Sequence, residues 1–110
     1  MAGELVQVPL NGASLEGELV VPSGSQGLVV FVHGSGSSRL SPRNTYVARV
    51  LQEAGLATFL FDLLTPAEDQ VYANRFDIPL LTERLGTVIH WLASKDRTRG
   101  LRPGLFGAST

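Results

Sequence analysis

The last seven residues, GLFGAST, join an apolar stretch to a turn of small residues that carries a hydroxyl group. Gly107, Ser109 and Thr110 occupy the first, third and fourth positions of the pattern G-x-S-x-G. In this pattern the serine lies in a strained strand-to-helix turn, which holds its hydroxyl clear of the sheet for attack on a carbonyl carbon. The N–H of the next residue stabilises the oxyanion that forms. The spacing therefore makes Ser109 a candidate nucleophile and the Thr110 N–H a candidate oxyanion donor.

A second loop of small residues, HGSGSS, follows the apolar residues 28–32. Acyl-transfer sites with such a turn take their other oxyanion donor from a main-chain N–H just after a His-Gly pair, and here that N–H belongs to Ser35. Two alternatives stay open, because a G-x-S at a strand end is often an ordinary turn and glycine-rich loops also cradle phosphates. The loop has neither the lysine of a P-loop nor the spacing G-x-G-x-x-G.

The elements around these loops follow from hydrophobic periodicity. Residues 4–8 and 14–21 flank Asn11-Gly12, which predicts an antiparallel hairpin near a sheet edge. Three later apolar strands are expected: one at residues 28–32, one in ATFLFDLLTP that ends near Asp62, and one in LRPGLFGA. These strands alternate with two helices, and such alternation predicts βαβ crossovers and a parallel sheet.

The two helices have recognisable start signals. Ser41 is placed as an N-cap and Pro42 as the first helical residue, with Gly55 as the stop. Asp77 caps the second helix, and the segment AEDQVYANRF before it is expected to be a polar loop. The apolar stripe of the first helix is predicted at Tyr46, Val47, Val50, Leu51 and Ala54, and that of the second at Leu81, Leu85, Val88 and Leu92.

Composition limits the class of protein. Apolar residues make up 44% of the 110 residues and charged residues 17%, which suits one packed globular domain. The absence of cysteine excludes disulfides, thiolate metal sites and a cysteine nucleophile. The net charge of −1 gives no sign of a nucleic-acid or membrane partner. The first ten residues do not resemble a signal peptide, so a cytoplasmic location is expected.

With these motifs in place, the chain resembles part of an α/β-hydrolase and, within that superfamily, the dienelactone hydrolase group. The stretches that carry the resemblance are GLVVFVHGSGSS, SPRNTYVARVLQEAGLATFLFDLLTP and LRPGLFGAST. The resemblance implies Ser109 as nucleophile, the Ser35 and Thr110 N–H groups as oxyanion hole, and a small ester, lactone or thioester as substrate. It implies the strand order 1-2-4-3-5 with the two helices on opposite faces, and it requires no metal or organic cofactor.

The sequence also departs from this family. A triad in such enzymes runs in the order Ser, Asp or Glu, His, yet no residue follows Thr110. Residues 1–110 are therefore expected to be the N-terminal portion of one incomplete hydrolase domain, truncated after the nucleophile elbow. The alternative is an inert fragment or a non-enzymatic module, because a serine without a base is a poor nucleophile. Dienelactone hydrolases carry cysteine as nucleophile where this chain has serine.

The remaining polar residues are weaker candidates. Arg39 and Arg43 flank the His-Gly loop, as surface charges or as a clamp for a carboxylate on the substrate. In the resembling family, His33 supports the loop with its side chain. His90 is expected on the exposed face of its helix. Asp62 ends a strand, where an acidic residue usually caps or turns the chain.

Overall fold

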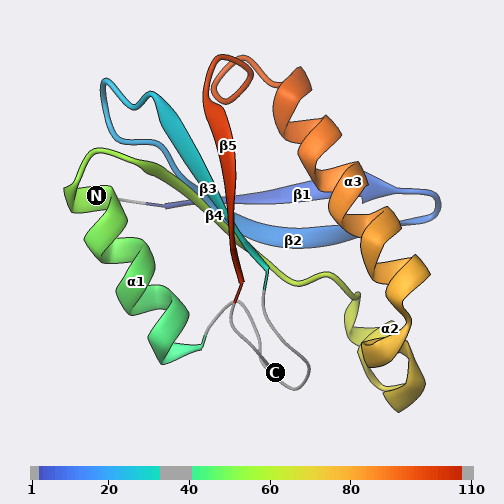
Figure 1. The fold of residues 1–110 in the computed structure, drawn as a ribbon. Coiled ribbons are helices and arrows are strands. Elements are labelled where there is room, and N and C mark those ends of the chain that lie inside the picture. The colour runs from blue at the N-terminus through green and yellow to red at the C-terminus, as the bar shows by residue number, and fades with distance from the viewer. Residues whose placement is uncertain (1–2, 33–40, 108–110) are drawn as a thin grey trace.

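A computed structural model describes residues 3–32 and 41–107, without the side chain of Arg75. Figure 1 shows a twisted sheet with helices packed against it. In chain order the elements are β1 (Glu4–Leu10), β2 (Ala13–Val20), β3 (Gly27–Val32), α1 (Pro42–Glu53), β4 (Ala57–Phe61), α2 (Pro66–Asp69), the 3-10 helix η1 (Tyr72–Phe76), α3 (Ile78–Ser94) and β5 (Arg102–Gly107).

The five strands form one sheet in the order β1-β2-β4-β3-β5, which confirms the predicted order. Strand β2 is antiparallel to both β1 and β4, whereas β3 is parallel to its two neighbours, β4 and β5. The hairpin between β1 and β2 turns at Asn11-Gly12, and Gly12 adopts a φ of 81°. That left-handed conformation is nearly free of strain only in glycine, so the residue type closes the hairpin.

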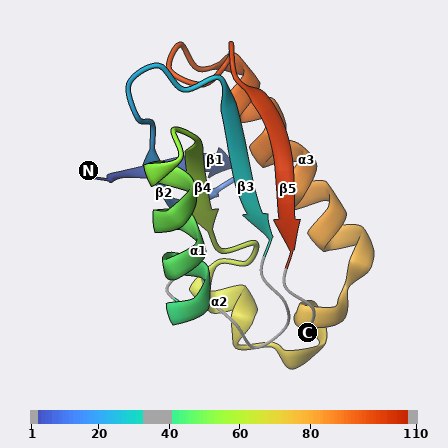
Figure 2. The same cartoon turned by 60° about the vertical axis from the view of Figure 1, so that its left-hand side comes forward.

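The two long helices cover opposite faces of the sheet, as Figure 2 shows. Adjacent residues of β3 point to opposite faces: Val30 belongs to the cluster beneath α3, and Phe31 belongs to the cluster beneath α1. The larger cluster includes the completely buried Phe59 and Phe61 of β4 together with Val88 of α3. Burial on both faces explains why β3 and β4 are continuous apolar runs rather than alternating ones.

Helix α1 begins at Pro42 as predicted, but the predicted apolar stripe is partly wrong. Tyr46 and Val50 are 65% and 46% exposed, while Asn44 and Ala48 are the buried residues of this helix. Val47 and Leu51 do pack against the smaller cluster. The helix therefore faces the sheet through a strip centred on a small side chain, which lets it lie close to β3 and β4.

The connection between β4 and α3 contains two short helices where the sequence predicted a polar loop. Helix α2 begins after Thr65, and η1 follows directly. Helix α3 was predicted well: the Asp77 side chain accepts a hydrogen bond from the Leu80 N–H at 3.1 Å, and Leu92 of the expected stripe is buried. His90 is exposed, as expected.

Packing at Gly17 yields a stability prediction. A Cβ atom at this position of β2 would lie 2.5 Å from Cζ of Phe59, whose ring stacks on that of Phe61 with centroids 5.2 Å apart. We expect Gly17→Ala to lower the free energy of unfolding by about 1–3 kcal/mol, because a packed core resists added volume. Chemical denaturation measures this loss.

The matched control is Gly86→Ala in α3, where a Cβ atom would meet nothing within 4 Å. Alanine at an open helix position stabilises relative to glycine, by about 0.5–1 kcal/mol. Equal effects of the two substitutions would contradict the steric account of Gly17.

Candidate functional site

The carboxyl ends of β3, β4 and β5 lie at one edge of the sheet because these three strands are parallel. Val32 pairs with Gly107, and Phe31 pairs with both Phe106 and Leu60. A Cβ atom on Gly107 would lie 3.7 Å from the carbonyl oxygen of Val32. The segments after β3 and after β5 therefore leave the sheet from directly paired residues.

Most of the predicted site residues follow these two strand ends and lie outside the described residues: Ser35, Arg39, Ser109 and Thr110, together with His33. Their predicted roles stay predictions. Ser35 comes three residues after Val32, and Ser109 two residues after Gly107. The register of β3 and β5 thus fixes where the segments that carry the candidate nucleophile and its oxyanion donor leave the sheet.

Arg43 is the one described residue of the predicted set. It is exposed in the first turn of α1, three residues after the end of segment 33–40. This location agrees with a surface charge and leaves the carboxylate clamp as a proposal. Asp62, the first residue after β4, is half-buried at the same edge, and its N–H donates to the Glu16 carbonyl across a 3.5 Å separation.

A partly buried ion pair after β4 was not anticipated from the sequence. Arg84 of α3 donates to both carboxylate oxygens of Glu68, with Nη1–Oε1 and Nη2–Oε2 distances of 2.7 and 2.5 Å. Its Nη1 also donates to the Leu63 carbonyl at 3.3 Å. The Arg84 side chain is only 12% exposed. These bonds join the segment after β4 to the middle of α3.

Glu68 also completes a capping box with Thr65. The Thr65 hydroxyl accepts from the Glu68 N–H at 3.2 Å, and the Thr65 N–H donates back to the Glu68 carboxylate at 2.9 Å. The spacing T-x-x-E is a known signal for a helix start and was available in the sequence. Its partner Arg84 is 16 residues away, and no local pattern points to it.

The ion pair sets the charge of Glu68. Hydrogen bonds from Arg84 are the largest cause that lowers the pKa of this carboxyl from 4.5 to about 2, against the opposing effect of burial. The same contact raises the pKa of Arg84. A carboxyl whose pKa is depressed by folding stabilises the protein above its unfolded pKa. That contribution is lost as pH falls from about 4.5 through about 2.

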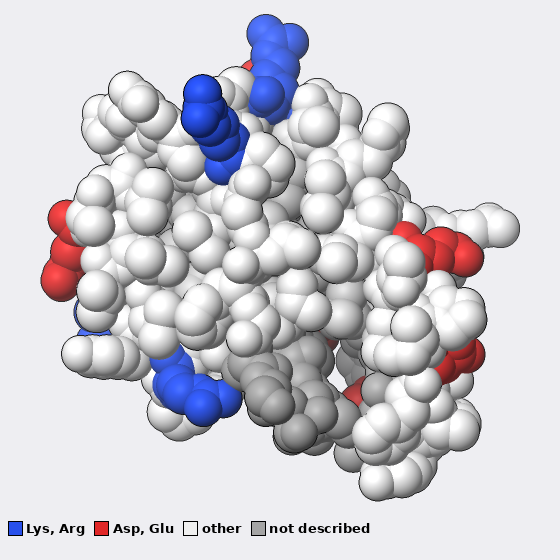
Figure 3. Space-filling view, viewed as in Figure 1, with Lys and Arg blue, Asp and Glu red and all other residues white. Residues whose placement is uncertain are grey.

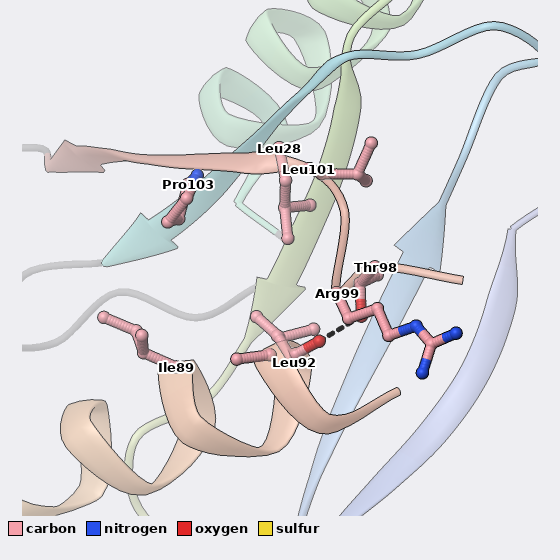
Figure 4. Close-up of a pocket in the computed structure, with 8 residues that line it drawn as sticks. Leu28, Ile89, Leu92, Thr98, Arg99, Leu101 and Pro103 are labelled. Carbon is pink, nitrogen blue, oxygen red and sulfur yellow. Dashed lines mark hydrogen bonds between the residues drawn. The ribbon is translucent and has the colours of Figure 1, made fainter. Parts of the chain in front are cut away.

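Figure 4 shows a small cavity at the other end of the parallel strands. Its volume is about 130 Å³, and it lies among Leu28 of β3, Pro103 of β5 and Leu92 of α3. Leu28 and Pro103 are paired near the amino ends of their strands. The Thr98 hydroxyl at its wall donates to the Leu92 carbonyl at 2.5 Å. The cavity is mainly apolar and remote from the edge that carries the candidate nucleophile.

The described residues form neither a concentrated charged patch on the face seen in Figure 3 nor a metal site. In the face seen in Figure 3, Lys, Arg, Asp and Glu side chains are few and scattered. Within residues 3–32 and 41–107, no group of three or more His, Asp or Glu residues is arranged to hold a metal ion. Among the described helices, none has the length and apolar character needed to cross a membrane.

Comparison with known proteins defines the class. No protein-family model matches the chain. A dienelactone hydrolase from Anabaena variabilis superposes with a TM-score of 0.92 at 50% sequence identity, over 99% of this chain and 52% of that one. Est1E from Butyrivibrio proteoclasticus (16% identity, TM-score 0.73, 98% of this chain and 40% of that one) and the Pyrococcus furiosus esterase Pf2001 (20%, 0.71, 96% and 41%) share the fold.

Two Mycobacterium tuberculosis proteins, each named as a candidate phosphoribosyl transferase, are 56% identical over 107 residues. The match covers 97% of this chain and 24% of each of theirs. The chain thus spans about a quarter of these curated relatives and about half of the dienelactone hydrolase.

The structure is therefore a partial α/β-hydrolase fold, with the mixed sheet and flanking helices of that class. Within the class, the chain resembles the dienelactone hydrolase group. The Pyrococcus furiosus esterase, at 20% identity, shares this fold.

The ion pair gives a prediction on acid stability. We expect Glu68→Gln to lower the free energy of unfolding at pH 7 by about 1–2 kcal/mol, because a charged hydrogen-bond acceptor is lost beside a partly buried guanidinium. The difference from the parent protein should shrink as pH falls from 4.5 toward 2, where Glu68 itself becomes protonated. Urea denaturation at several pH values measures both effects.

The control is Asp96→Asn, which removes an ion pair with Arg99 whose two side chains are 89% and 66% exposed. Such exposed pairs add little to stability, so unfolding at pH 7 should change hardly at all. A Glu68→Gln deficit that stays constant between pH 7 and pH 2 would show that the charge of Glu68 is not its cause.

Proposed function

We propose that this chain forms the nucleophile-bearing part of a serine hydrolase that cleaves small esters, lactones or thioesters through an acyl-enzyme. The observation that carries the proposal is the parallel pairing of β3 with β5 up to Val32 and Gly107. Because of this pairing, the segment with the His-Gly loop and the segment with Ser109 both begin at the same edge of the sheet, after paired residues. Dienelactone hydrolase at 50% identity supports the same reaction class.

In the proposed reaction, Ser109 Oγ bonds to the substrate carbonyl carbon while a base takes its proton. The carbonyl electrons move to oxygen, and the N–H groups of Ser35 and Thr110 donate to the oxyanion. Collapse of this intermediate expels the alcohol, or the thiol of a thioester, which receives the proton. Water then attacks the acyl carbon while the base takes a proton from it, and the second intermediate breaks its bond to Ser109 Oγ, which regains the proton as the carboxylic acid leaves. Loss of one oxyanion donor typically costs about 10²–10³ in kcat.

The triad order in this fold is Ser, acid, His, so we propose that the base and its orienting acid follow Ser109 in the complete hydrolase domain. His90 is exposed on α3, and α3 belongs to the crossover that precedes β5. We therefore assign it no part in proton transfer.

The phosphoribosyl transferase name of the M. tuberculosis relatives does not compete with this assignment. The matched segment is 24% of those proteins and 52% of the dienelactone hydrolase. A complete hydrolase domain would therefore occupy about half of such a relative. The other half is long enough for a second domain, outside the segment that this chain matches.

Substrate recognition by charge is a secondary part of the proposal. Arg39 and Arg43 flank the His-Gly loop in sequence, and Arg43 is exposed at the start of α1. Guanidinium groups bind carboxylates through paired hydrogen bonds. We propose that they favour substrates that carry a carboxylate beside the scissile bond.

The nucleophile can be tested in the protein with its complete hydrolase domain. A fluorophosphonate probe should label the parent protein, and Ser109→Ala should abolish labelling and lower ester hydrolysis by about 10⁴-fold or more. The control Ser94→Ala changes a serine in α3 whose hydroxyl donates to the Trp91 carbonyl at 2.7 Å, and it should be labelled normally.

Labelling that survives Ser109→Ala would remove this residue from the role. Heat protection by inorganic phosphate together with an unlabelled parent protein would instead favour a phosphate-binding loop.

A further inference from the structure

The first turn of α1 contains a buried side-chain amide. Asn44 is only 3% exposed, and further parts of the domain can only add to this burial. Within residues 3–32 and 41–107, the Asn44 side chain makes no hydrogen bond. Buried polar groups are nearly always hydrogen-bonded, because an unpaired one has lost its water without compensation. The Asn44 amide therefore points to a partner other than the described residues.

Asn44 lies at the carboxyl edge of the parallel strands. Asn44 and Ala48 are four residues apart, so they share the face of α1 that meets the sheet. Ala48 packs with Phe31 and Leu60, each the second-last residue of its strand. Asn44 lies one turn, about 5.4 Å, closer to the beginning of α1, which Figures 1 and 2 both place on the side where β3 and β5 end. Parallel α/β sheets bind their ligands outside this edge.

The same turn has main-chain donors that the helix does not use. Pro42 has no N–H, and the Thr45 N–H donates to the Ser41 carbonyl at 3.0 Å. Ser41 makes no capping bond with its side chain. The N–H groups of Arg43 and Asn44 thus have no acceptor within the helix. Because side chains on a helix tilt toward its N-terminus, the Asn44 amide lies over this turn.

The charge at this turn favours an anion. The N-terminus of a helix carries a positive partial charge. The first turn of α1 has no acidic residue to offset that charge, and the exposed Arg43 side chain adds a full positive charge. Main-chain N–H groups in this position bind carboxylate and phosphate oxygens.

We propose that the first turn of α1 binds a small oxyanion, a carboxylate or a phosphate group, through the N–H groups of Arg43 and Asn44 and the side-chain amide of Asn44. The inference goes beyond the reaction proposed for Ser109 and does not depend on it. Asn44 Nδ2 donates to one oxygen of the anion, and the two main-chain N–H groups donate to its other oxygens. A buried donor that is unpaired in the absence of the anion becomes paired when the anion binds, which strengthens binding.

The test uses Asn44→Leu in the protein with its complete hydrolase domain. Leucine keeps the approximate size of the buried side chain but donates no hydrogen bond. Without anions, the melting temperature of the variant should be unchanged or higher, because an unpaired buried amide has been removed. Phosphate or acetate should bind to the variant about tenfold more weakly. Thermal melting in sodium phosphate, sodium acetate and sodium chloride at equal ionic strength measures both effects.

Two arginine variants give the matched control. Arg43→Ala removes the charge at the first turn and should weaken anion binding by about twofold to fivefold. Arg49→Ala removes an exposed arginine further along the same helix and should leave binding unchanged. In the parent protein, the amide NMR signals of Arg43 and Asn44 should shift and saturate as the anion is added.

The outcomes separate this inference from its rivals. Protection by acetate identifies a carboxylate ligand and protection by phosphate alone identifies a phosphate group, and either supports the site. Anion protection that persists in Asn44→Leu, or its absence from the parent protein, would overturn the inference. A lower melting temperature of Asn44→Leu without anions would also overturn it, because the amide would then be bonded within the protein. Fluorophosphonate labelling of the same samples reports separately on Ser109.

Discussion

The candidate site depends on one interaction, the parallel hydrogen-bonded pairing of β3 with β5. These strands are separated by 69 residues in the chain, from Val32 to Arg102 at their nearest ends, yet they pair continuously from Gly27–Arg102 to Val32–Gly107. A slip by one residue would turn every side chain of β5 to the other face. Phe106 would then lose its contact with Phe31; the centroids of the two rings are now 5.1 Å apart. The register that packs this face also fixes where the candidate serine turn begins.

The core on the other face enforces the same register through β4. Phe59 and Phe61 are stacked and completely buried, and the ring of Trp91 lies 6.3 Å from that of Phe59. Because β4 lies between β2 and β3, these rings tie the hairpin to the parallel strands. Glycine at position 17 leaves the space that the Phe59 ring occupies. The geometry of the sheet edge at the candidate site is thus set by packing well away from it.

Much of this architecture could be predicted from local signals. Apolar runs predicted β3 and β4, and the turn dipeptide Asn11-Gly12 predicted the hairpin of β1 and β2. Burial in α1 was harder, since periodicity alone cannot tell which apolar residues meet the sheet: Tyr46 stays exposed while Asn44 is buried. Helix α2 is four residues long, too short to show periodicity, so only the T-x-x-E start signal of Thr65 and Glu68 could have predicted it. The contact between Arg84 and Glu68 depends on the completed fold. The predicted roles of Ser35 and Ser109 are based on their sequence motifs and on the register of β3 and β5, the strands that precede them.

Under the proposed function, the open edge of β5 links folding to catalysis. Among the described strands β5 is the last in the sheet order, and its Leu105 is 58% exposed. An apolar strand with an open edge favours pairing with a further strand. The dienelactone hydrolase is about twice as long as the matched segment, so under the proposed function the same additional residues would cover β5 and supply the acid and the histidine. Covering Leu105 would stabilise the strand that ends two residues before Ser109. Assembly of the triad and protection of the sheet would then be one event, and the serine would gain its base only in a domain whose edge is closed.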